Sequence, residues 1–115
     1  MSNAQEHLEK AIQLNPEYAD AHYELALILS EQCEHEKSKA HFLKTIEIRP
    51  EFPLAHFNYA LLLKEMKDHK SSQEHFLEAI DLDQHFADAH YHFGLLLAEL
   101  EDFEEAKNNL EKATD

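Results

Sequence analysis

Residues 19–23 read Ala-Asp-Ala-His-Tyr, and residues 87–91 repeat the same five residues. Between them, residues 55–57 read Ala-His-Phe, so that His22, His56 and His90 follow one another at equal intervals of 34 residues. A second set of histidines recurs at the same interval, at positions 7, 41 and 75. Self-similarity at one period indicates stacked structural repeats. The sequence therefore predicts a repeat protein whose unit has the length of this interval.

Each repeat contains two stretches with helical spacing of apolar residues. In the first repeat, Leu25, Ile28 and Leu29 follow this spacing, and Phe42 and Ile46 resume it after a short interruption. The pattern predicts one helix over about residues 20–32 and a second over about residues 35–48. Prolines 16 and 50 end the second helix of a pair, because proline disfavours helical geometry in the preceding residue.

The helix pair resembles the tetratricopeptide repeat, a unit of about 34 residues with the pattern W-x2-L-G-x2-Y, then A-x3-F, then P. The first repeat reads His22-x2-Leu25-Ala26-x2-Leu29, then Ser38-x3-Phe42 and Pro50, and the next two repeats match similarly. Ala26, Ala60 and Gly94 occupy the position where two helices approach closely. The resemblance implies an all-α fold, a right-handed α-solenoid of antiparallel helix pairs with about three and a half repeats. The expected divisions are a half repeat at 1–18, repeats at 19–52 and 53–86, and a truncated repeat at 87–115.

Composition limits the classes of partner. The 115 residues are 43% apolar and carry a formal charge of −14, which disfavours nucleic acid as a partner. The apolar runs are too short to span a membrane, no secretory signal precedes them, and Cys33 is the single cysteine. We expect a cytoplasmic protein that binds neither nucleic acid nor membranes.

A candidate binding surface lies on the first helix of each repeat. Three consecutive apolar residues at 27–29, 61–63 and 95–97 span about 200° of each helix, more than one neighbouring helix covers. The resemblance places the fifth and ninth repeat positions on a concave groove. These positions hold Tyr23, Leu27, Phe57, Leu61, Tyr91 and Leu95. Acidic residues border them, so the expected partner is a protein or peptide that is apolar with basic flanks.

Two alternatives apply to these residues. The rings and leucines can instead complete the packing between helices, with the acidic residues forming a solvated face.

Family members that clamp acidic chaperone tails use basic residues and asparagines, and of those positions only Asn58 matches here. His92 and Asp88 occupy two of the others, so a chaperone-tail clamp is disfavoured. Asn58 remains a candidate contact for the backbone of a peptide.

Ten histidines raise the question of a metal site. Zinc requires three or four ligands around one point, often two of them one helical turn apart, and the sequence has no His-x3-His pair. We expect His22, His56 and His90 to be packing residues, with no metal and no cofactor. No nucleophile motif or glycine-rich loop is present, so we expect no enzymatic activity.

The predicted function is a noncatalytic scaffold that binds a partner segment in the groove of the first helices. One alternative is self-association through uncapped ends, for which Ala106, Leu110 and Ala113 are the candidate residues, giving a homo-oligomer. Another alternative is a segment that positions an enzyme domain in a longer protein.

Overall fold

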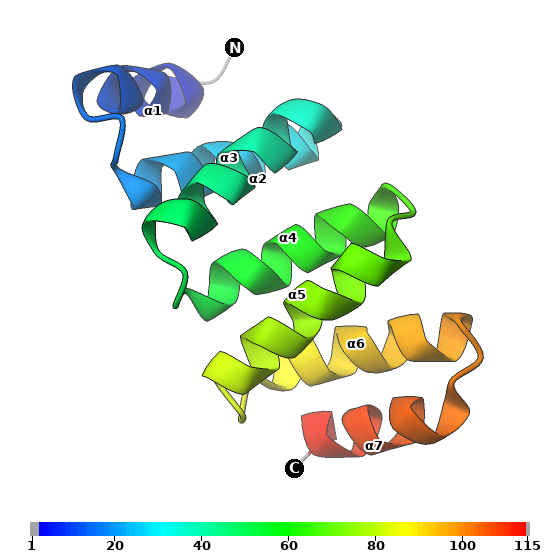
Figure 1. Cartoon of the computed structure of the whole chain (residues 1–115). Coiled ribbons are helices and arrows are strands. Elements are labelled where there is room, and N and C mark those ends of the chain that lie inside the picture. Colours follow the sequence, from blue (N-terminus) through cyan, green and yellow to red (C-terminus); the bar gives the residue numbers. More distant parts are fainter. Residues whose placement is uncertain (1–2, 115) are drawn as a thin grey trace. The chain divides into compact units, whose positions relative to one another are not determined.

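The computed structural model describes residues 3–114. Seven α-helices joined by short turns make up this range (Figure 1). They are α1 (Asn3–Leu14), α2 (Ala19–Glu31), α3 (His35–Ile48), α4 (Pro53–Glu65), α5 (His69–Leu82), α6 (Ala87–Glu99) and α7 (Phe103–Thr114). The all-α prediction of three and a half helix pairs is confirmed. Both helices expected in the first repeat begin and end within one residue of α2 and α3.

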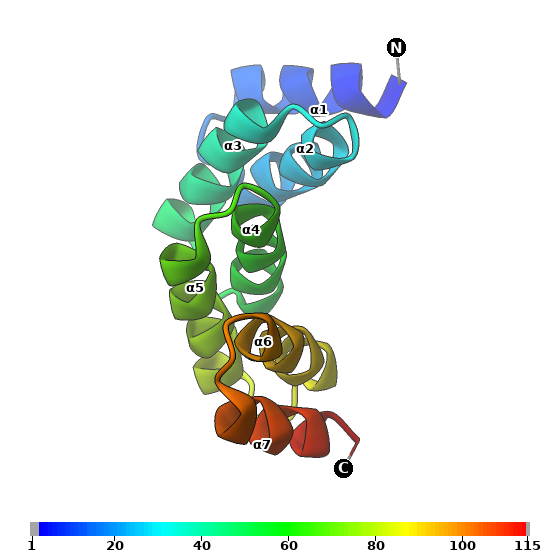
Figure 2. The ribbon, with the colours of Figure 1, turned by 90° about the vertical axis from the view of Figure 1, so that its right-hand side faces the viewer.

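The described residues form two compact units, divided between Ala55 and His56 near the start of α4. The N-terminal unit holds α1, α2 and α3, and the C-terminal unit holds most of α4 with α5, α6 and α7. In the N-terminal unit α2 and α3 form an antiparallel hairpin, and α1 packs against α2 (Figure 2). In the C-terminal unit α6 and α7 form the corresponding hairpin.

The turn inside each hairpin has the same backbone geometry. Cys33, Lys67 and Glu101 have φ values of 60°, 67° and 66°. The amide of the following residue bonds back into the helix, as in Glu34 N–H to the Leu29 carbonyl at 2.9 Å. This is the Schellman arrangement, in which a left-handed residue ends a helix and satisfies its last carbonyls. Between residues 3 and 114 this arrangement occurs at Cys33, Lys67 and Glu101, each time without glycine.

Small residues set the spacing within each hairpin, as the sequence predicted. Ala26 and Ala60 are fully buried, and the hydroxyls of Ser38 and Ser72 donate to their carbonyls at 2.7 Å. At Gly94 the approach is closer, because an added Cβ would lie 2.8 Å from the Leu110 side chain. None of the helices between residues 3 and 114 is both long and apolar enough to cross a membrane.

Candidate protein-binding surface

The three aromatic rings predicted to line a groove lie in two different environments. Tyr23 and Phe57 are each only 8% exposed, whereas Tyr91 is 47% exposed. Tyr23 is covered by Phe52, with ring centroids 4.9 Å apart. Phe57 is covered in the same way by Phe86, also at 4.9 Å.

This burial corrects the expectation of a row of three accessible anchors. The loops that follow α3 and α5 each place an aromatic side chain on the ring of the same repeat, and so enclose Tyr23 and Phe57. Of the three rings, Tyr91 alone keeps an exposed face, beside the ring of His92 at 5.2 Å. Sequence reasoning missed the roles of Phe52 and Phe86, although these two rings are themselves one repeat apart.

The predicted leucines are more accessible than the buried rings. Leu27, Leu61 and Leu95 are partly exposed, while the third residue of each apolar run (Leu29, Leu63 and Leu97) is buried. Each apolar run therefore begins at a leucine that is only partly covered, and of these Leu61 also packs against the core of the C-terminal unit.

In the C-terminal unit, α4 and α6 place several predicted residues on neighbouring helices. Asn58 and Leu61 of α4 are partly exposed, and so are His92 and Leu95 of α6. The two helices touch through Phe57 and His92, whose ring centroids are 5.6 Å apart. Near their other ends, Lys64 Nζ lies 3.3 Å from Glu99 Oε1. We call Asn58, Leu61, Tyr91, His92 and Leu95 the α4–α6 face.

The predicted acidic border is partly neutralised by cations within the chain. Arg49 bonds Asp20 at 2.8 Å, and Lys64 pairs with Glu99 at 3.3 Å. Asp88 is exposed in the first turn of α6. Burial, with a smaller effect from the Lys64 cation, lowers the pKa of His92, so its ring favours the neutral form.

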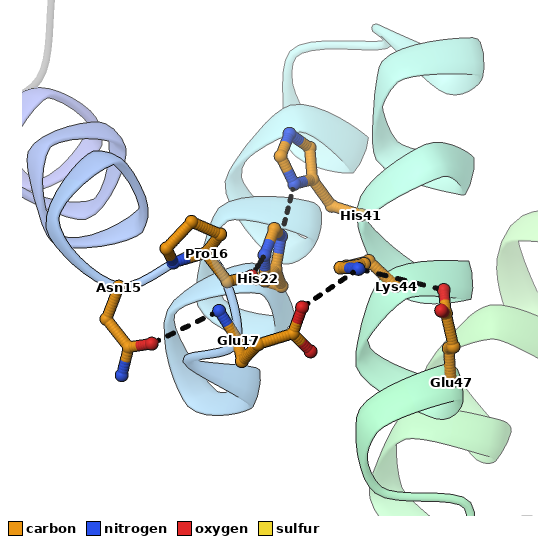
Figure 3. Close-up of polar contacts among 7 residues, drawn as sticks. All are labelled: Asn15, Pro16, Glu17, His22, His41, Lys44 and Glu47. Atoms are coloured by element: carbon orange, nitrogen blue, oxygen red, sulfur yellow. Dashed lines mark hydrogen bonds and ion pairs between the residues drawn. The ribbon is translucent and has the colours of Figure 1, made fainter.

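Figure 3 shows how the histidines of the first repeat are used. His22 is 6% exposed and bonds on both sides, through Nε2 to the Pro16 carbonyl at 2.9 Å and through Nδ1 to His41 Nδ1 at 2.9 Å. Because a carbonyl only accepts, His22 donates from Nε2, and His41 must then donate to His22 Nδ1. The expected packing role of His22 is accompanied by a specific polar role.

The second repeat keeps this pair and the third replaces one member. His56 Nδ1 lies 3.0 Å from His75 Nδ1. In the third repeat Asn109 stands at the corresponding position and places Oδ1 3.0 Å from His90 Nδ1. These pairs join the two helices of a hairpin, a relation that the repeat period alone does not reveal.

Four of the histidines form two side-chain pairs, His22 with His41 and His56 with His75. Between residues 3 and 114, no group of three or more histidine, cysteine or acidic side chains is placed to hold a metal ion. His41 and His75 instead have pKa values below the usual range, first because of burial and second because of the adjacent His22 or His56.

The residues predicted for self-association are only partly accessible. Ala106 is 3% exposed and belongs to the core of the C-terminal unit, so little of its surface is open to a second chain. Leu110 and Ala113 are partly exposed. Beside Leu110, Phe103 is 67% exposed and lines a shallow apolar depression with it.

Sequence comparison agrees with this geometry. A tetratricopeptide repeat model matches residues 19–52, 54–86 and 87–115, and a second TPR repeat model matches residues 2–32. The chain belongs to the tetratricopeptide repeat family. TPR repeats are generally protein–protein interaction modules, so a protein-binding surface is the relevant kind of site. No curated protein matches the sequence.

Solved TPR structures share the fold. The crystal structure of MamA matches with a TM-score of 0.90 at 22% identity, covering 96% of this chain and 64% of the MamA chain. MamA from residue 41 to its end, from Desulfovibrio magneticus RS-1, matches with a TM-score of 0.86 at 19% identity, covering 93% and 60%. The present TPR chain thus spans less than two thirds of either MamA chain.

Proposed function

We propose that this TPR chain is a noncatalytic scaffold that binds a segment of a partner protein on the first helices of its repeats. The α4–α6 face carries the proposal, because two neighbouring helices there present partly exposed leucines at the same repeat position. Apolar side chains that a hairpin leaves uncovered favour contact with a partner. Leu27 gives α2 an equivalent position in the N-terminal unit.

Polar groups on this face fit an extended segment. Asn58 carries both a donor and an acceptor, and His92 adds a ring nitrogen beside the exposed Tyr91. The net charge of −14 favours partners whose apolar residues have basic neighbours, mainly by accelerating and orienting their encounter.

A pull-down with a matched control tests this function. The variant Leu61→Glu/Leu95→Glu places two carboxylates on the α4–α6 face and should abolish capture of a partner. The control Leu77→Glu changes a leucine that is 52% exposed on α5 and should leave capture intact. Equal loss in both variants, or no loss in either with helicity preserved, contradicts binding at this face.

Self-association is a second candidate, favoured by the exposure of Phe103 beside Leu110. If this end of α7 joins two copies, light scattering should show mass rising with concentration, and Phe103→Glu should restore the monomer. A monomer across the full concentration range excludes this candidate.

A further inference from the structure

The first helix of each repeat carries a different side chain at one buried position. This position holds Leu25 in α2, Tyr59 in α4 and Phe93 in α6. The Tyr59 ring lies against His75, with ring centroids 4.7 Å apart. The Phe93 ring stacks on Phe76, with centroids 5.9 Å apart. Two of the three repeats thus fill this position with an aromatic ring, whereas the first repeat has the smaller leucine.

Beside Leu25, the N-terminal unit has an open cavity whose walls come from α1, α2 and α3. The cavity measures about 390 Å³, which lies within the range of about 300–1,000 Å³ that small-molecule sites occupy. Leu25 and His41 both line it, and they are the first-repeat equivalents of Tyr59 and His75. The cavity therefore lies at the place where the middle repeat holds its own aromatic ring.

The lining of this cavity combines apolar side chains with oxygen acceptors. Leu25 and Leu29 are buried and Ile12 is partly exposed, and together they supply apolar surface. Glu9 and Gln13 are exposed on α1 and supply a carboxylate and an amide oxygen. An aromatic ring with a hydroxyl group matches this lining, because the ring covers the apolar side chains while the hydroxyl donates to one of the oxygens.

The His41 side of the cavity is fixed by contacts within the hairpin (Figure 3). His41 Nδ1 lies 2.9 Å from His22 Nδ1, and His22 Nε2 lies 2.9 Å from the Pro16 carbonyl. These bonds orient the imidazole ring of His41 before any ligand is bound. A preformed wall of this kind lowers the entropic cost of binding a planar ligand.

We propose that this cavity binds a phenol ring, in the position that Tyr59 occupies in the middle repeat. The ring would lie between Leu25 and His41, and its hydroxyl would donate to Glu9 or Gln13. A tyrosine side chain of a partner protein and a free phenol share this chemistry. The inference is independent of the proposed scaffold function, because the cavity and the α4–α6 face have no residue in common.

An NMR titration of the ¹⁵N-labelled protein with p-cresol, the side-chain analogue of tyrosine, tests the site. We expect saturable amide shifts centred on Leu25, Ala40 and His41, with a dissociation constant on the order of 1 mM for so small a ligand. Toluene, which lacks the hydroxyl, should bind about two- to tenfold more weakly.

N-acetyltyrosinamide distinguishes the two sources of the ring. Binding of both this compound and p-cresol indicates that the cavity takes a tyrosine side chain. Binding of p-cresol alone indicates that it takes a free phenol.

The repeats themselves supply the variants. Leu25→Tyr gives the first repeat the ring of the middle repeat, so that p-cresol should bind about tenfold more weakly or not at all, while the melting temperature stays equal or rises. Leu25→Phe introduces the ring of the third repeat, and it should have the same effect if the tyrosine variant does not fold. The matched control Leu27→Tyr adds a ring at a partly exposed position of α2 outside the cavity, and it should leave the affinity within about twofold.

Several results would overturn the proposal. These are the absence of saturable shifts with p-cresol, shifts centred on residues that do not line the cavity, or unchanged binding in a folded Leu25→Tyr or Leu25→Phe variant. Toluene binding as tightly as p-cresol would contradict a phenol as the ligand. Partner capture on the α4–α6 face is a separate measurement, so the failure of one proposal leaves the other standing.

Discussion

Tyr23 and Tyr91 occupy the same repeat position, yet their exposed fractions are 8% and 47%. Phe52 covers Tyr23. Tyr23→Ala should lower the free energy of unfolding by about 3 kcal/mol, because it removes a buried ring from between Phe42 and Phe52. Tyr91→Ala should cost less than about 1 kcal/mol. Urea unfolding of both variants measures this difference, and equal losses would contradict the two environments.

The histidine pairs predict that acid destabilises the fold. His41 and His75 have lowered pKa values in the folded chain, first because of burial and second because of their partner histidines. Below the ordinary histidine pKa of about 6.5, the unfolded chain therefore binds more protons than the folded one. The free energy of unfolding should be highest above about pH 6.5 and fall as the pH decreases toward the lowered values. Melting temperatures between pH 7.5 and 5.5 test this expectation.

A control for the pH effect comes from the third repeat, where Asn109 stands in the place of His41 and His75. The double variant His41→Asn/His75→Asn should fold and show a smaller decrease in melting temperature with acid. An unchanged decrease would assign the acid sensitivity to other groups.

At the scale of the helices and turns, the three hairpin turns share a backbone strain that a glycine would relieve. Cys33, Lys67 and Glu101 hold left-handed backbone conformations that glycine adopts at lower cost. Lys67→Gly should raise the free energy of unfolding by about 0.5–1 kcal/mol, because the turn no longer forces a side chain into this conformation. Urea unfolding measures the gain. By contrast, Glu78→Gly, at an exposed position inside α5, should lower stability by about 1 kcal/mol.

The helices themselves were predictable from spacing. Leu25, Ile28 and Leu29 marked the face that α2 buries, and α2 and α3 begin and end within one residue of expectation. The left-handed conformation of the turns was harder to predict, because the positions that adopt it hold Cys33, Lys67 and Glu101 and not the glycine that usually marks such a turn.

Over the whole molecule, the charge of −14 predicts how a partner should respond to salt. Association with a basic-flanked apolar segment should slow several-fold between about 50 and 500 mM NaCl, since screening shortens the reach of the acidic surface. Dissociation, which depends on the apolar contacts, should change less. Stopped-flow measurement of both rates tests this, and a salt-insensitive association rate would exclude electrostatic steering.

The repeat period determined the family, the helix pairs and the close approach at Ala26, Ala60 and Gly94, because these follow from local spacing and side-chain size. It did not determine which of the equivalent side chains are accessible. Tyr23 and Phe57 look like accessible anchors in the sequence, and the tertiary structure covers them with Phe52 and Phe86. The contact between His22 Nδ1 and His41 Nδ1 likewise exists only because α2 and α3 pack together as a hairpin. The exposure and the pairing of a side chain depend on contacts between segments that are distant in the chain. A repeating pattern shows which positions are equivalent, but it does not show these contacts, which only the tertiary structure reveals.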